Sequence, residues 1–205
     1  MLFKKHDGDP AGQPPALGEI LSQTQVNSLL YSDPFLKAGF VSKLVSETRI
    51  PVLYLDLDLL YSGYVASGAL APNPNVTIYQ PTEHTIAGVL TEILSRASMY
   101  QVLVVVDSVN GLFNLLNYEK QVGRKVASVV MLLASFMHRT KSTIVIASMA
   151  RYRKEEGWVL SPTGKRFIET KNSKRILLEK GKDGIVVNLL NDSAKVVLPA
   201  ETIPL

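Results

Sequence analysis

The chain has 205 residues and a mass of 22.5 kDa, the size of one medium domain, and 46% of its residues are hydrophobic while 20% are charged. This balance is that of a globular protein and is too apolar for a disordered one. Cysteine is absent, which excludes a disulfide framework and thiolate zinc sites, and three widely separated histidines leave little scope for a metal cluster. We therefore expect no metal centre.

The sequence also bears on targeting and on domain organisation. No uncharged apolar run reaches the roughly 18 residues of a membrane span, and the first ten residues, MLFKKHDGDP, lack the apolar segment of a secretory signal. We expect a soluble cytoplasmic protein with no membrane contact. Residues 1–16 are rich in glycine, proline and charge and predict a flexible leader, followed by one core domain over residues 17–205.

Positive charge is concentrated in one part of the chain. The net charge is +4, and residues 151–182 hold ten of the 22 lysines and arginines against four acidic residues, a local balance of +6. The remaining residues therefore carry a balance of −2. A local excess of this kind favours contact with a polyanion, and a solvated surface is the alternative.

Strand patterns alternate with helical patterns after the leader. We predict strands at residues 26–31, 50–57, 76–79, 102–106 and 143–147, and helices at 35–48, 83–97 and about 119–138. Two of the strands are continuous apolar runs, which is typical of strands buried on both faces of a parallel sheet. The alternation of strand and helix predicts right-handed crossovers and an α/β fold.

The last third of the chain has a different pattern. Residues 158–160 and 166–169 flank Ser-Pro-Thr-Gly, which predicts a hairpin turn. Short strands are expected at 175–178, 184–190 and 194–198, separated by Lys-Asp-Gly and Asn-Asp-Ser turn signals. The α/β core is therefore predicted to be extended at one edge by antiparallel strands.

The strand at 102–106 ends in Asp107, which is the pattern of a Walker B strand. Ligands of open α/β sheets bind at the carboxyl ends of the strands, where an aspartate can hold Mg²⁺ through water. A helix cap or a turn is the alternative role for this aspartate.

A Walker B aspartate works with a Walker A loop, G-x-x-x-x-G-K-[ST], whose backbone amides wrap the phosphates between the first strand and the first helix. The corresponding segment, residues 31–39, reads YSDPFLKAG. Ser32 replaces the first glycine and Lys37 the second. Ala38 replaces the lysine and Gly39 the hydroxyl residue, so every key position is altered.

With these motifs the chain resembles the RadA/KaiC group of RecA-like ATPase cores, especially the small archaeal RadA paralogs. The resemblance covers about residues 16–198. Its matches are Ala16 to Leu21 with A-L-D-x-L-L, Tyr31, Asp33 and Pro34 with Y-G-D-P-G-x-G-K-T, Val52 to Asp58 with V-x-Y-I-D-T-E, Asp107-Ser108 with the Walker B D-S pair, and Thr143 to Met149 with the fourth core strand. The resemblance implies a RecA-like, mostly parallel central sheet with flanking helices.

The resemblance also implies where a nucleotide pocket would lie. Asp58 stands at the place of the acid that polarises the attacking water in the family, where this chain has the shorter aspartate. The predicted vestigial pocket comprises Ser32, Lys37, Asp58 and Asp107. Because the phosphate loop is altered, we expect no catalytic residue, no ATP or Mg²⁺ cofactor and no hydrolysis. A weak ATPase that uses Lys37 and Asp107 is an alternative.

RecA-like cores bind single-stranded DNA through two loops, which by position correspond here to residues 110–124 and about 150–174. The second loop lies in the basic window and contains interleaved aromatic residues. Basic side chains neutralise phosphates and aromatic faces stack on bases. The predicted nucleic-acid contacts are Arg151, Arg153, Lys154, Lys165, Arg166, Lys171 and Lys174.

The sequence therefore predicts a non-catalytic RadA-like paralog. We expect it to bind nucleic acid, single-stranded DNA first, and to modulate recombination and repair through a RadA-type partner or as a homo-oligomer. The alternative is an ATPase-dead RecA-like ring subunit, similar to those of the Elongator accessory complex, that acts as a protein or tRNA interaction module.

Overall fold

The computed structural model describes residues 17–117, 120–154, 157–160 and 173–204. Its strands are β1 (Val26–Tyr31), β2 (Val52–Asp56), β3 (Val76–Tyr79), β4 (Leu103–Asp107), β5 (Thr143–Arg153), β6 (Gly157–Leu160), β7 (Ser173–Lys180), β8 (Gly184–Leu189) and β9 (Ala194–Pro199). Its helices are α1 (Leu17–Ser22), α2 (Pro34–Glu47), α3 (Leu60–Ala66), α4 (Ile86–Met99), α5 (Val109–Leu115) and α6 (Val122–Thr140), with a 3₁₀ turn at Ala200–Thr202.

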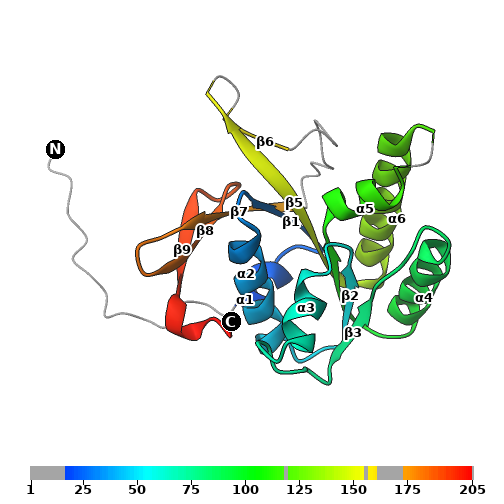
Figure 1. Cartoon of the computed structure of the whole chain (residues 1–205), viewed down its shortest axis with the longest axis horizontal. Coiled ribbons are helices and arrows are strands. Elements are labelled where there is room, and N and C mark those ends of the chain that lie inside the picture. The colour runs from blue at the N-terminus through cyan, green and yellow to red at the C-terminus, as the bar shows by residue number, and fades with distance from the viewer. Residues whose placement is uncertain (1–16, 118–119, 155–156, 161–172, 205) are drawn as a thin grey trace, which may run out of the picture.

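The strands form one sheet in the order β3-β2-β4-β5-β1-β7-β8-β9, with β6 paired to β5 (Figure 1). All neighbours from β3 to β7 run parallel, and β8 and β9 continue the sheet antiparallel. This topology confirms the predicted α/β fold with a mostly parallel sheet and antiparallel strands at its C-terminal edge.

Helices cover both faces of the sheet and bury two separate cores. Helices α1, α2 and α3 pack on one face, and α4, α5 and α6 pack on the other (Figure 1). Strand β4 serves both cores: Leu103 and Val105 belong to the first, and Val104 and Val106 to the second. Because successive side chains of a strand point to opposite faces, a strand covered on both sides must be apolar throughout.

The C-terminal part differs from the prediction in two ways. The strand expected at 143–147 continues to Arg153, and β6 pairs antiparallel with this extension, with Tyr152 opposite Trp158. The first of the three expected edge strands, β7, runs parallel to β1, so the antiparallel pattern begins only with β8. The predicted turn at 161–164, the strand at 166–169 and the leader at 1–16 lie outside the described residues.

None of the helices in the described segments combines the length and the hydropathy of a transmembrane span.

Gly184 at the start of β8 provides a test of the antiparallel edge. Its φ is 154°, and a Cβ there would lie 2.0 Å from the carbonyl oxygen of Leu198 on β9. We expect Gly184→Ala to lower the free energy of unfolding by about 2 kcal/mol, measured by urea denaturation, because the hairpin must open to admit the methyl group.

The matched control is Gly88→Ala on α4, where a Cβ would meet no atom within 4 Å. Alanine favours a helix over glycine by roughly 0.5–1 kcal/mol, so this variant should be as stable as the parent or slightly more stable. Equal stability of the two variants would contradict the close approach of β8 and β9.

Candidate functional site

Three charged side chains meet at the carboxyl edge of the sheet. Lys37 lies in the first turn of α2, Asp58 follows β2, and Asp107 is the last residue of β4. The Lys37 Nζ lies 2.7 Å from Asp58 Oδ2 and 2.5 Å from Asp107 Oδ1. The side chains of Lys37 and Asp107 are 1% and 2% exposed, and that of Asp58 is 26% exposed. We call these three residues the Lys37 cluster.

Neutral donors complete the hydrogen bonding of both carboxylates. Tyr54 donates its hydroxyl to Asp107 Oδ2 at 2.6 Å, and Ser108 donates to Asp58 Oδ1 at 3.1 Å. The Tyr31 hydroxyl lies 3.5 Å from Asp58 Oδ2, and its ring centroid is 5.0 Å from the Lys37 ammonium. Each of the four carboxylate oxygens therefore has a donor, as buried charges require.

At Lys37 and Asp107, the pairing of opposite charges opposes the effect of burial on the pKa. Burial alone would lower the pKa of Lys37, but the carboxylates of Asp107 and Asp58 raise it above its ordinary value. Burial raises the pKa of Asp107, while the ammonium of Lys37 and the hydroxyl of Tyr54 oppose that rise. The ammonium is therefore firmly protonated, and Asp107 depends on it to stay ionised.

The start of α2 leaves little room for a phosphate loop. Only Ser32 and Asp33 separate β1 from α2, and the Asp33 carboxylate accepts a hydrogen bond of 2.8 Å from the backbone N–H of Phe35. Aspartate before proline is a favourable helix start, which explains why the helix begins at Pro34. A carboxylate thus occupies the helix N-terminus that would attract a phosphate in a nucleotide-binding protein.

Gly111 brings α5 against the cluster. A Cβ at this position would lie 2.6 Å from Asp58 Oδ1 and 2.7 Å from the Cβ of Leu57. Its backbone N–H donates to the hydroxyl of Ser108, the residue that in turn donates to Asp58. The sequence did not predict Gly111 or Tyr54 as part of the site. For Tyr54, the available signal was a tyrosine within an otherwise aliphatic strand.

The fit of Mg-ATP can be tested on these contacts. In the described residues, no group of three or more His, Cys, Asp or Glu side chains could hold a metal ion. Asp58 and Asp107 are bridged by the ammonium of Lys37, so a divalent cation would have to displace it. The same ammonium would have to leave both carboxylates to reach a phosphate. In this arrangement the ammonium and the two carboxylates are already paired with one another.

The structure brings together three of the four residues of the predicted vestigial pocket. Lys37, Asp58 and Asp107 form the cluster, whereas Ser32 is exposed in the turn before α2. Of the predicted nucleic-acid contacts, Arg151 and Lys154 are exposed at the end of β5. Arg153 lies in β5, and its side chain is outside the description, as are Lys165, Arg166 and Lys171 altogether.

The prediction for Lys174 is wrong. This side chain is only 5% exposed, and its ammonium donates to the Ile20 carbonyl at 3.2 Å and to Gln23 Oε1 at 2.6 Å. It also lies 3.5 Å from Asp192 Oδ2. Lys174 therefore binds the end of α1 to β7 and is not available to a phosphate.

The first predicted loop, residues 110–124, is also partly wrong. Helix α5 occupies Val109–Leu115, and α6 begins at Val122. The side chain of Asn110 accepts a hydrogen bond of 2.9 Å from the backbone N–H of Met149, which holds α5 against β5. Ser108 caps α5 by accepting from Gly111, a local signal that favours a helix over a loop.

Substitution of Lys37 tests the dependence of Asp107 on its cation. We expect Lys37→Met to lower the free energy of unfolding at pH 7.5 by about 3–5 kcal/mol, because it leaves a buried carboxylate without its cationic partner. The pKa of Asp107 is already raised by burial, and it should rise further without the ammonium. Protonation then relieves the folded state, so the loss should be smaller at pH 5.

The double variant Lys37→Met/Asp107→Asn separates charge from packing. It removes both charges and keeps an oxygen that can accept from Tyr54, so most of the lost stability should return. Urea denaturation of the three proteins at both pH values is the measurement. A single variant within about 1 kcal/mol of the parent would show that the ion pair contributes little.

Comparisons with known proteins agree with the fold. No family model and no curated protein sequence matches the chain. Among solved structures, it is similar to a KaiC-like protein from the hyperthermophilic archaeon Pyrococcus horikoshii OT3, with a TM-score of 0.52 and 13% identity over 90% of this chain and 89% of that chain. At this identity the likeness shows the fold alone, and the chain has a RecA-like α/β fold.

Proposed function

We propose that this RecA-like chain is a non-catalytic binding protein that acts on nucleic acid, with single-stranded DNA as the first candidate. The observation that carries the proposal is the position of the Lys37 ammonium, which is held between Asp58 and Asp107. A nucleotide-binding lysine must be free to neutralise phosphate oxygens, whereas this one neutralises two carboxylates of its own chain.

Two further features at the same edge disfavour a nucleotide. The Asp33 carboxylate caps α2 and adds a negative charge beside the place of the phosphates. Phe35, in the first turn of α2, is 70% exposed and projects an apolar ring into solvent near the same place. A bound phosphate would be repelled by the Asp33 carboxylate, and it would also require the ammonium of Lys37 to separate from Asp58 and Asp107. Both effects raise the free-energy cost of binding a nucleotide.

The case for nucleic acid comes from the shape and charge of β5. Its residues Thr143–Ile146 pair with β4 and Ile144–Met149 pair with β1, so residues 150–153 extend past both neighbours. With β6, this extension forms an arm that projects from the sheet (Figure 1). Exposed Arg151 and Lys154 lie on it, within the window of +6 charge. Cations on a projecting arm can approach a phosphate backbone without obstruction from the core.

The proposal also includes a role in recombination and repair, in which the chain acts with a RadA-type partner or with a second copy of itself. The resemblance of the core motifs supports this part. A tRNA-binding interaction module is the competing function, and it predicts a different ranking of nucleic-acid ligands.

Thermal unfolding in the presence of Mg-ATP tests the first half of the proposal. We expect 5 mM Mg-ATP (a concentration of about 100 times a typical 50 µM dissociation constant) to leave the Tm unchanged, because the Lys37 cluster must open before a phosphate can bind. A protein with a 50 µM site would gain about 2.7 kcal/mol under these conditions. A Tm increase of several degrees, or phosphate release above the buffer rate, would refute the assignment as non-catalytic.

Charge reversal on the arm tests the second half. We expect Arg151→Glu/Lys154→Glu to weaken binding of a labelled single-stranded DNA by at least about 10-fold at 100 mM salt and to reduce the salt dependence of the affinity by about two phosphate contacts. Fluorescence anisotropy with single-stranded DNA, duplex DNA and tRNA gives both the affinity and the ranking.

The matched control is Lys182→Glu/Lys195→Glu, which makes the same change in net charge at exposed positions in the β7–β8 turn and on β9. This control should bind as the parent does, apart from a small long-range effect. Equal weakening by both double variants would show that binding depends on the overall positive charge of the protein and not on the arm. Binding of tRNA tighter than that of DNA would favour the interaction module.

A further inference from the structure

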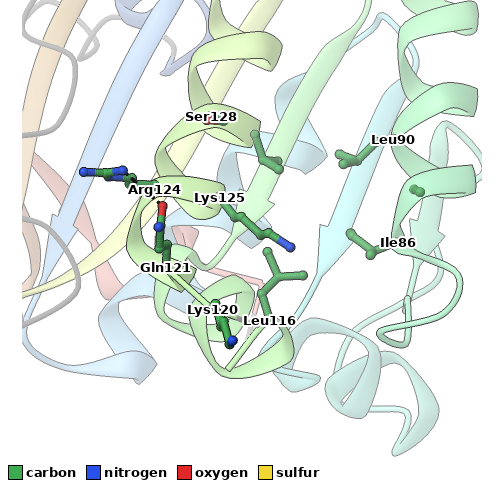
Figure 2. Close-up of a pocket in the computed structure, with 10 residues that line it drawn as sticks. Ile86, Leu90, Leu116, Lys120, Gln121, Arg124, Lys125 and Ser128 are labelled. Atoms are coloured by element: carbon green, nitrogen blue, oxygen red, sulfur yellow. Dashed lines mark hydrogen bonds between the residues drawn. The ribbon is translucent and has the colours of Figure 1, made fainter. Parts of the chain in front are cut away.

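A groove lies between α4 and α6, on the face of the sheet away from α2. Its cavity has a volume of about 390 Å³, within the range of pockets that bind ligands or anchor side chains. The N-terminal halves of the two helices form its walls, and Leu116, at the end of α5, closes one end (Figure 2). This groove is separate from the Lys37 cluster, with which it shares no residue.

The floor of the groove is aliphatic. Ile86 and Leu90 of α4 line it (Figure 2), as does Val129 of α6, and the lining side chains of Ala87 and Ser128 are small. One turn further along α6, Leu132 is 49% exposed and continues the apolar surface from the position of Ser128. An aliphatic insertion would remove these side chains from water without any change in the core.

The rim of the groove is cationic. Lys120, Arg124 and Lys125 line it, and among the described lining residues none is acidic. Lys125 points across the groove toward α4, and Arg124 extends from the other side of α6, where it donates to Gln121 Oε1 at 3.1 Å (Figure 2). Positive charge therefore borders the apolar floor on the α6 side.

We propose that this groove docks an acidic amphipathic segment of a partner protein, with an aliphatic side chain inserted between α4 and α6 and neighbouring Asp or Glu side chains paired with the rim. Charge complementarity selects this occupant, since a helix laid in a groove is recognised by its apolar anchors and its flanking charges.

Other occupants match the groove less well. The leader of this chain offers Leu2 and Phe3, but Lys4 and Lys5 follow them and would meet a rim of the same sign. Nucleic acid offers anionic phosphates, but the described lining contains no aromatic ring on which a base could stack. The inference is independent of the proposed function, which places nucleic acid on the β5–β6 arm.

The test uses three labelled 15-residue helical peptides against the full chain. The first has leucines at positions i and i+4 flanked by glutamates, the second has lysines in place of the glutamates, and the third has serines in place of the leucines. We expect only the first to bind, with a dissociation constant of roughly 10–100 µM that weakens with salt, measured by fluorescence anisotropy. The other two should bind at least 10-fold more weakly.

Variants locate the binding. Ser128→Phe fills the groove and Lys120→Glu/Arg124→Glu reverses its rim, so each should weaken the first peptide by at least 10-fold. Their controls are Ala127→Phe, exposed on α6 beside the groove but not lining it, and Arg139→Glu/Lys141→Glu at the far end of α6. The controls should bind as the parent does, and thermal unfolding verifies that all variants are folded.

Several results would overturn the proposal. Equal binding of the three peptides, or no effect of the groove variants, would remove the groove as a docking site. Binding of octanoate without the peptide would assign it to a small amphipathic anion, and loss of oligo(dT) affinity in Lys120→Glu/Arg124→Glu without peptide binding would assign it to nucleic acid. Self-association that Ser128→Phe abolishes would assign it to a second copy of this chain.

Discussion

The contact of one buried ammonium with two carboxylates determines what the carboxyl edge of this sheet can do. The ammonium of Lys37 joins the start of α2 to the carboxylates of Asp58, after β2, and Asp107, at the end of β4. Burial of these charges is costly, and the cost is offset only while the three remain together. Tyr54, Ser108 and Gly111 are then constrained by the cluster, because each occupies a position that satisfies or accommodates one of its oxygens.

The main elements of the fold could be predicted from the sequence because its apolar patterns are strong. The strands at 26–31 and 76–79 agree with the structure to the residue, since each apolar segment is bounded by turn or capping residues. Helix α4 begins three residues later than predicted, because Thr82 and Thr85 form a hydrogen-bonded turn before it. Helix α3 was missed: it has seven residues and one buried side chain, too short for a helical period.

The members of the cluster could be predicted, but their pairing could not. Motif positions indicated Lys37, Asp58 and Asp107, which are up to 70 residues apart along the chain. Whether a lysine after one strand reaches an aspartate at the end of another depends on strand order and on where the intervening helix begins. The same limit explains Lys174: a charge count includes it in the basic window, while only the packing of α1 on β7 shows that its ammonium is buried.

Among the described residues, some cations are buried and stabilise the fold, and others are exposed on the surface. Lys37 and Lys174 are buried and paired, so their charges are used within the fold. Exposed cations include Arg151 and Lys154 on the β5–β6 arm, and Lys120 and Arg124 beside the groove between α4 and α6. The buried lysines therefore stabilise the fold through partners within the chain, whereas Arg151 and Lys154 on the β5–β6 arm are exposed to solvent.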